Sequence, residues 1–225
     1  MNENEKEPVA VLWDMDGTLI DTEPYWIRAE MDLCAAHGAT WTHEDGLSLV
    51  GNPLSVSAFA LQERGVQLEI PVIVEALLAE VTAAVREHLP WQEDAHRLLE
   101  RFTRRGIPQA LVTMSYASLA RALTDQADVF SAVVTGETVA NGKPHPEPYL
   151  KAAAMLGVPI ERCLAIEDSP SGVRSAHASG ARAVGVERLV PVPQLPGLTR
   201  VRSLDSLTDE VIAAIIGGAS FDEVA

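Results

Sequence analysis

Cysteine, basic residues and long apolar runs are scarce in this chain. These scarcities argue against disulfide bonds, polyanionic partners and transmembrane helices. Only Cys34 and Cys163 occur among the 225 residues, without Cys-x-x-Cys spacing, so we expect both to be reduced thiols. No run of about 18 apolar residues occurs, and the sequence therefore predicts no transmembrane helix. The polar, acidic residues 1–8 are unlike a signal peptide. Together these features predict a cytoplasmic protein.

The shortage of positive charge limits the possible partners. Lys and Arg number 17 against 32 Asp and Glu, which gives a formal net charge of −15 at pH 7. Because this charge repels polyanions, we expect no nucleic acid and no membrane surface as a partner. A small phosphorylated metabolite stays compatible, since local cations and a metal ion can offset the overall field. We expect the protein to be a monomer.

What is present is the alternation of an α/β protein. Apolar runs at 109–112, 132–134, 163–166 and 183–186 are predicted to be buried strands. Amphipathic stretches with helical spacing lie between them, and glycines follow several of these stretches, where a left-handed C-cap is needed. Short connections between alternating strands and helices indicate a doubly wound parallel sheet covered on both faces.

One segment breaks this alternation. Residues 22–88 contain no convincing strand and show helical spacing instead, with one helix expected from Glu23 to His37. A helical block of this length, inserted after the first strand, predicts a cap domain over 22–88 and a core made of 8–21 and 89–217. The alternative is a set of surface helices packed directly on the sheet.

The first strand ends in the most informative motif. After the apolar run 9–13, residues 14–18 read Asp-Met-Asp-Gly-Thr. Open parallel sheets bind their ligands at the carboxyl ends of strands, so Asp14 and Asp16 can reach one site there. Two carboxylates suit Mg²⁺, and one of them can attack a phosphoryl group. The alternative is an ordinary acidic turn.

Two later strand ends supply groups that bind anions. Thr113 closes the second predicted strand and offers a hydroxyl, and the backbone amides that follow it, from Met114 onward, lie at a helix start. Lys143 lies between Gly142 and Pro144, where it supplies a point charge for a phosphate and for a nucleophilic carboxylate. A solvated loop lysine is the alternative for Lys143.

Acidic residues also follow the strand at 163–166. Glu167 and Asp168 can complete an oxygen-ligand shell for Mg²⁺. The alternative is helix capping by Asp168 or Ser169 ahead of Pro170. Each alternative is reasonable by itself, but four strand ends that carry Asp/Asp, Thr, Lys and Glu/Asp in this order favour a single catalytic site.

With these motifs the chain resembles the haloacid dehalogenase superfamily, in the branch of β-phosphoglucomutase and small sugar-phosphate phosphatases. The resemblance extends from Val9 to about Leu207. It implies a Rossmann-like α/β core with a helical cap inserted after the first motif. Because dehalogenase members lack an aspartate at the position of Asp16, it also favours phosphoryl chemistry over dehalogenation.

The resemblance implies a role for each motif residue. Asp14 would be the nucleophile that forms an aspartyl-phosphate, and Asp16 the general acid and base. Thr113 and the Met114 amide would hold phosphate oxygens, while Lys143 would steady the phosphoryl group and Asp14. The implied Mg²⁺ ligands are the Asp14 carboxylate, the Asp16 backbone carbonyl and Asp168, with Glu167 as a direct ligand or one that acts through water.

Two features favour a Mg²⁺-dependent phosphatase over a phosphomutase. The mutase carries a cap arginine for a second phosphate, but residues 50–54 contain no Arg or Lys. It also has a histidine where this chain has Trp26. We expect Trp26 and Glu23 to contact the substrate, which would be a sugar or polyol phosphate. A β-phosphoglucomutase-like mutase stays the alternative.

A non-catalytic phospho-acceptor or binding module is a more distant alternative. Signalling receivers share the doubly wound fold, but they are about half this length and lack an inserted cap. They also carry an acidic pair ahead of a separate acceptor aspartate, whereas here one strand end carries both carboxylates. Turnover of an aryl phosphate with Mg²⁺ distinguishes an enzyme from such a module.

Overall fold

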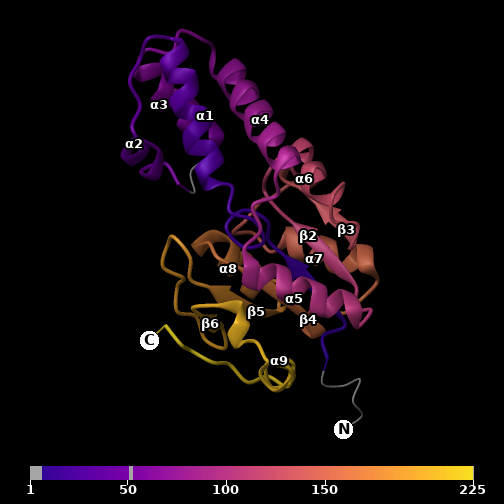
Figure 1. Ribbon diagram of the computed structural model, residues 1–225. Coiled ribbons are helices and arrows are strands. Elements are labelled where there is room, and N and C mark those ends of the chain that lie inside the picture. Colours follow the sequence, from indigo (N-terminus) through magenta and orange to yellow (C-terminus); the bar gives the residue numbers. More distant parts are fainter. Residues whose placement is uncertain (1–6, 51–52, 225) are drawn as a thin grey trace. The chain divides into compact units, whose positions relative to one another are not determined.

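A computed structural model describes residues 7–50 and 53–224 of the chain. The chain divides into two compact units (Figure 1). One unit contains the described residues up to Ile20 together with those from Trp91 onward, and the other is the inserted segment Asp21–Pro90. Inside the first unit Ile20 bridges to Trp91, and inside the second the Asp21 amide donates to the Pro90 carbonyl at 2.8 Å.

The first unit is built on a six-stranded sheet in which every pairing is parallel. The strand order is β3-β2-β1-β4-β5-β6, so the order reverses between β1 and β4. Ligands of open α/β sheets bind in the crevice at such a reversal, beyond the carboxyl ends of the strands. The strands are β1 Ala10–Trp13, β2 Gln109–Val112, β3 Phe130–Val134, β4 Cys163–Glu167, β5 Arg182–Val186 and β6 Thr199–Val201.

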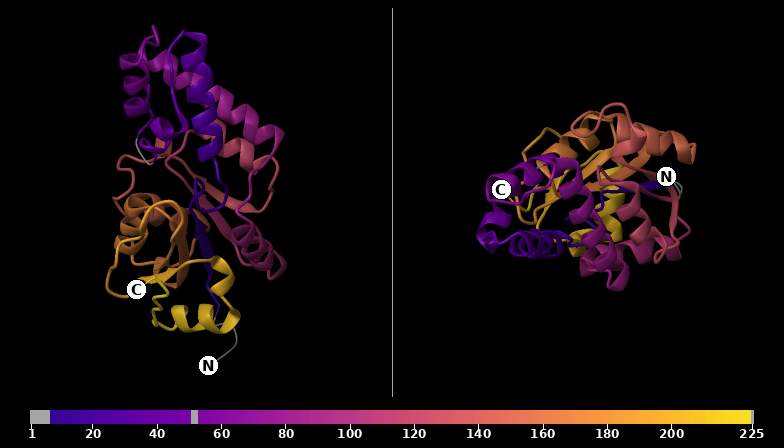
Figure 2. Two further views of the ribbon diagram at one scale, coloured as in Figure 1. Left: turned by 60° about the vertical axis from the view of Figure 1, so that its left-hand side comes forward. Right: turned by 90° about the horizontal axis from the view of Figure 1, so that it is seen from above.

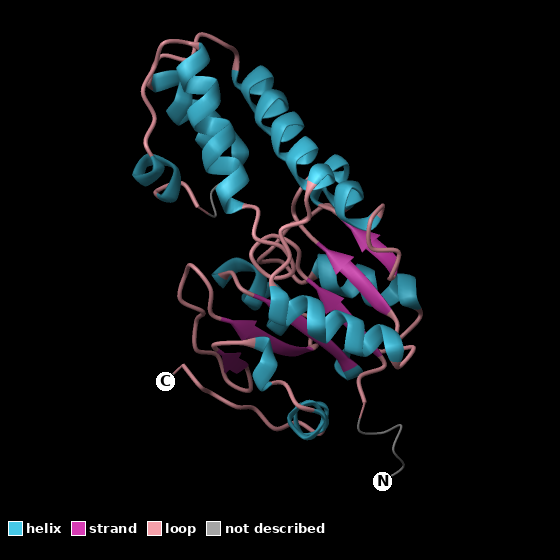
Figure 3. Cartoon of the chain, viewed as in Figure 1, coloured by secondary structure: helices cyan, strands magenta, loops and turns pink. Residues whose placement is uncertain are grey.

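Helices cover both faces of this sheet (Figure 3). On one face, alternate strand residues such as Leu12 and Val112 pack in one buried cluster with Tyr149 and Val173. On the other face, the Trp13 ring meets Phe102 edge-on, with the ring centroids 6.4 Å apart. The helices of this unit are α5 Glu93–Arg104, α6 Ala117–Thr124, α7 Glu147–Leu156, α8 Pro170–Ala178 and α9 Asp209–Ile216. Short 3₁₀ turns are η2 Gly136–Thr138, η3 Ile160–Arg162 and η4 Leu204–Ser206.

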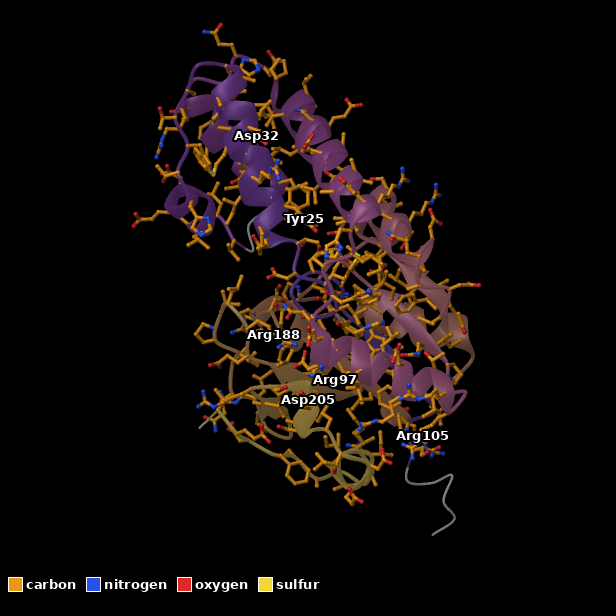
Figure 4. All side chains as sticks on the ribbon, in the orientation of Figure 1. Tyr25, Asp32, Arg97, Arg105, Arg188 and Asp205 are labelled. Atoms are coloured by element: carbon orange, nitrogen blue, oxygen red, sulfur yellow. The ribbon has the colours of Figure 1, made fainter. Side chains whose placement is uncertain are left out.

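Ion pairs join α5 to the later part of the same unit (Figure 4). Arg97 contacts Asp205 at 2.7 Å, and Arg105 contacts Asp209 at 2.8 Å. The Arg188 guanidinium meets Asp94 at 2.6 Å, at the start of α5. Because most of these side chains are partly exposed, we assign them a role in positioning segments rather than a large contribution to stability.

The inserted unit is helical throughout its regular elements. It consists of α1 Glu23–Ala36, α2 His43–Leu47, α3 Leu54–Glu63 and α4 Ile70–Glu87. In both views of Figure 2, α1 and α3 lie beside α4. On α4 the side chains of Ile73, Leu77, Val81 and Val85 are buried, with the spacing of one helical face. Buried Glu30 of α1 accepts a hydrogen bond from Trp41 Nε1 at 3.1 Å.

The structure confirms the predicted α/β fold, with two differences in detail. The strand β6 was not predicted, because three residues are too few to show a period. The helical spacing of Tyr149, Leu150, Ala153 and Leu156 predicts one buried face, but on α7 Leu150 points outward and is 42% exposed. The predicted C-cap glycines Gly106, Gly157 and Gly180 all have positive φ. In the described part of the chain, no helix is both long and apolar enough to cross a membrane.

Candidate active site

Lys143 is the centre of the site. It lies in the loop between η2 and α7, and a cis peptide bond joins it to Pro144. Its side chain is 5% exposed, and its Nζ atom contacts Asp14 Oδ1 at 2.5 Å and Glu167 Oε1 at 2.6 Å. The same ammonium donates to the Val112 carbonyl at 2.8 Å. Burial alone would lower the pKa of Lys143, but the two carboxylates raise it.

Glu167, the last residue of β4, is fully buried and held by several donors. Besides Lys143, Tyr149 OH donates to its Oε1 at 2.9 Å, and the Ser169 hydroxyl donates to its Oε2 at 3.2 Å. Gly172 of α8 leaves room for this carboxylate, since a Cβ atom there would lie 1.8 Å from Glu167 Oε1. Glu167 is therefore a fixed partner of Lys143.

Asp14 and Asp168 follow the neighbouring strands β1 and β4. Oxygen atoms of Asp14, Glu167 and Asp168 all lie within 4.8 Å of one another. Thr18 Oγ1 donates to Asp168 Oδ1 at 3.1 Å. Gly17 has φ +83°, and a Cβ there would lie 2.1 Å from Asp168 Oδ2, so only glycine fits this turn.

The charges of this cluster favour a cation. Burial and the Glu167 charge raise the pKa of Asp14 to about 7, although Lys143 acts in the opposite direction. Burial and the Asp14 charge raise the pKa of Asp168 to about 8. Three carboxylates share one ammonium, and hard oxygen donors of this kind fit Mg²⁺. Because Glu167 is already held by protein donors, Asp14 and Asp168 fit direct ligation better.

A second group of polar side chains surrounds Asp16. Ser115 Oγ donates to Asp16 Oδ2 at 2.6 Å, and Thr113 Oγ1 lies 3.4 Å from the same oxygen. The Ser115 amide donates to Thr113 Oγ1 at 2.9 Å. Met114 contacts the residues around Lys143, because its Sδ atom accepts a 3.4 Å hydrogen bond from the Lys143 amide.

We expected several backbone amides after Thr113 to be available for an anion, but two of them already donate to protein acceptors. The Ser115 amide is used by Thr113, and the Ala117 amide donates to Glu137 Oε2 at 2.7 Å. These two amides are therefore not available to a phosphate, and the Met114 amide stays our candidate. At the start of α8, Ser169 is the N-cap, since its hydroxyl accepts from the Gly172 amide at 3.0 Å. Asp168 is thus not the cap residue.

The predicted site residues all lie in the sheet unit, where direct contacts or shared neighbours connect them. They are Asp14, Asp16, Thr113, Met114, Lys143 and Asp168. Ser115, Tyr149 and Gly172 also belong to the site, but no sequence pattern marks them. A serine after a strand, an aromatic residue on a helix and a helical glycine all have ordinary structural explanations.

Residues predicted to choose the substrate belong to the inserted unit. Trp26 is half-buried in α1, and Glu23 begins that helix. In the segment 50–54, residues 51 and 52 lie outside the described residues. His145, beside Lys143, is an exposed loop residue whose Nδ1 accepts from the Glu147 amide at 3.2 Å.

Several curated proteins of similar sequence are named as phosphatases. Hexitol phosphatase A of Escherichia coli is 31% identical over 204 residues, which cover 88% of this chain and 92% of that protein. A fructose-1-phosphate phosphatase of Escherichia coli is 30% identical over 184 residues, which cover 80% of this chain and 96% of that protein.

Solved structures agree in fold. The crystal structure of CbbY from Rhodobacter sphaeroides in complex with phosphate superposes with a TM-score of 0.77 at 28% identity, and the match covers 89% of this chain and 96% of that one. A sequence model of the haloacid dehalogenase-like hydrolases matches residues 9–180. With its sheet order and its strand-end residues, this chain belongs to the haloacid dehalogenase-like hydrolase family.

Proposed function

We propose that this protein is a Mg²⁺-dependent phosphatase that hydrolyses a small phosphomonoester, a sugar or polyol phosphate, through an aspartyl-phosphate on Asp14. The single observation that carries this proposal is the buried contact of Lys143 with Asp14 and Glu167 beside Asp168. It joins a carboxylate nucleophile, a fixed positive charge and oxygen donors for a metal at the point where the strand order reverses.

The chain's own residues account for a two-step hydrolysis. A carboxylate oxygen of Asp14 attacks phosphorus, and the bond from phosphorus to the leaving oxygen breaks. Asp16 gives its proton to that oxygen as it leaves. Asp16 then takes a proton from the water molecule that attacks the aspartyl-phosphate, which releases inorganic phosphate and restores Asp14.

Charge neutralisation is the other requirement of phosphoryl transfer, whose transition state is loose and highly charged. Lys143 keeps its positive charge next to Asp14 because both neighbouring carboxylates stabilise it. Thr113 and the Met114 amide would hold phosphate oxygens. Asp14, Asp168 and the Asp16 carbonyl would hold Mg²⁺, which when bound supplies charge neutralisation at the phosphoryl group.

The relatives support the substrate class. Two of them are named for hexitol and fructose 1-phosphate hydrolysis, and Trp26 and Glu23 of α1 are our candidates for contacts with the hydroxylated part of such a substrate. A ring face and a carboxylate suit the carbon face and the hydroxyl groups of a polyol. We also propose that the protein acts as a cytoplasmic monomer without a nucleic acid or membrane partner, consistent with its net charge of −15.

A screen of phosphorylated metabolites tests the function. The purified protein with Mg²⁺ is incubated with hexose, hexitol and pentose phosphates, and free phosphate is measured. We expect release from at least one sugar or polyol phosphate by the wild type and none by Asp14→Asn. A hexose 1-phosphate with a bisphosphate primer is included, and efficient isomerisation with little phosphate release would establish a mutase instead.

A further inference from the structure

Asp16 transfers a proton in each step of the proposed mechanism, and its carboxyl group must be oriented for both transfers. Ser115 is in place to do so. Its hydroxyl donates to Asp16 Oδ2 at 2.6 Å, a short distance typical of a hydroxyl bonded to a carboxylate oxygen.

Thr113 cannot serve this purpose once substrate is bound. Its hydroxyl has one proton and lies 3.4 Å from Asp16 Oδ2, and that proton is also the one proposed for a phosphate oxygen. The Ser115 amide already donates to Thr113 Oγ1 at 2.9 Å. Thr113 therefore has one proton for two acceptors and a long contact with Asp16, whereas the Ser115 hydroxyl donates to Asp16 at 2.6 Å and is the steadier partner.

The backbone around Ser115 is fixed to the sheet unit at several points. The Thr113 amide donates to the Val134 carbonyl at 2.9 Å, and the Ala117 amide donates to Glu137 at 2.7 Å. Gly136 packs against Met114, because a Cβ on Gly136 would lie 2.6 Å from the Met114 carbonyl oxygen. A hydroxyl on so firmly held a turn is preorganised for its partner.

We propose that Ser115 is a positioning residue that orients the proton donor Asp16. Because the Ser115 hydroxyl donates to Oδ2, the transferable proton of Asp16 is kept on Oδ1. That proton moves to the leaving oxygen as the bond to phosphorus breaks. The resulting carboxylate keeps its hydrogen bond from Ser115 at Oδ2, and Oδ1 is then the atom that takes a proton from water. This inference rests on the proposed phosphatase function.

The dependence of kcat/KM on the leaving group distinguishes a positioning role of Ser115 from a merely structural one. An aryl phosphate leaves as its anion, whereas an alkyl phosphate needs a proton from Asp16. The ratio kcat/KM reports steps up to release of the leaving group, so the later base role of Asp16 does not enter it. Ser115→Ala removes the hydroxyl but keeps the amide that Thr113 uses.

We expect Ser115→Ala to lower kcat/KM about tenfold for an alkyl phosphate substrate and less than about twofold for p-nitrophenyl phosphate. Ser115→Thr, which keeps a hydroxyl, restores the wild-type ratio of the two values. Ser118→Ala, at an exposed serine in the first turn of α6, leaves both values unchanged. The aryl substrate also reports that each variant is folded.

A double-mutant cycle with Asp16 completes the test. In an Asp16→Ala background, Ser115→Ala should have no further effect on the alkyl-to-aryl ratio, because the group it orients is gone. An equal loss for both substrates, or no loss for either, overturns the proposal. Failure of the phosphatase function looks different: the wild type would then hydrolyse neither substrate faster than Asp14→Asn.

Discussion

At the scale of single residues, Lys143 determines how the acidic cluster is tolerated. One buried ammonium contacts two carboxylates, and a third lies close by. Removing a partner from a buried ion pair usually leaves an uncompensated charge. Here the cluster has more negative than positive charge, so removing one carboxylate relieves repulsion while Lys143 keeps a partner.

Asp14→Asn should therefore lose turnover by about 10⁴-fold or more, since an amide is not a nucleophile for phosphorus, and should also melt at a higher temperature. The raised pKa of Asp14 shows that its charge is disfavoured in the folded state. Phosphate release and thermal melting at pH 8 without metal measure the two effects. Asp125→Asn, at an exposed position, is the control. Turnover like that of the wild type would remove Asp14 from its role.

Glu30 gives a second prediction, on pH. Burial raises the pKa of Glu30 to about 7, although the Trp41 hydrogen bond opposes the shift. The folded state then binds a proton that the unfolded state releases near pH 4.5, so Glu30 lowers stability progressively between pH 4.5 and 7 and fully above pH 7.

Glu30→Gln removes this penalty and should be more stable than the wild type above pH 7, by up to about 3 kcal/mol. Below pH 4.5 the two proteins should be alike, because Glu30 is then protonated in both states. Differences in melting temperature across pH 4–8 measure the effect, since other carboxylates cancel in the comparison. Asp32→Asn, on the exposed face of α1, is the control. A constant difference at all pH values would contradict the assignment.

At the scale of elements, α8 packs closely against the end of β4 because Gly172 has no side chain. Gly172 stands in the first turn of α8, and the Glu167 carboxylate at the end of β4 fills the space beside it. A small residue on the helix thus allows a buried charged group on the strand.

Gly172→Ala should destabilise the protein by about 1–3 kcal/mol, as other overpacked sites do, despite the better helix propensity of alanine. Its Cβ would force Glu167 away from Lys143, so activity should fall as well. Ser171→Ala, an exposed neighbour on the same helix, should change neither quantity. Melting temperature and phosphate release test both variants. An unchanged melting temperature for Gly172→Ala would mean that Glu167 has another place to go.

Sequence and structure agree best where one local pattern decides the outcome. β1, β2 and β4 are largely apolar and buried on both faces, and parallel strands bring their carboxyl ends to one edge. That geometry is why the motif residues could be placed together from the sequence. The contact of Ser115 with Asp16 could not be predicted, because it depends on side-chain directions across a turn rather than on spacing.

At the scale of the whole molecule, the proposed metal site predicts that metal binding and stability are coupled. A cation that binds the folded acidic cluster and not the unfolded chain stabilises the protein, by about 2.7 kcal/mol at 100 times its dissociation constant. We expect Mg²⁺ to raise the melting temperature of the wild type, and to do so far less in Asp168→Asn.

Activity should follow the same metal. Excess EDTA should abolish phosphate release and added Mg²⁺ restore it, whereas Ca²⁺ should raise the melting temperature but support little turnover, because it accepts looser geometry and more ligands. Assays at equal ionic strength with Na⁺ are the control for general screening. Full activity in EDTA, or an equal melting shift in Asp168→Asn, would contradict the assigned ligands.

The first and last residues of the inserted unit, Asp21 and Pro90, are hydrogen-bonded neighbours. The Asp21 amide and the Pro90 carbonyl are 2.8 Å apart, directly beyond the pair formed by Ile20 and Trp91. A segment with adjoining ends can be exchanged for another of different length without a change in the strands on either side. Recombination between genes could therefore replace the insert as a cassette. Under the function proposed above, the choice of substrate would then evolve while the chemistry of Asp14 is inherited unchanged.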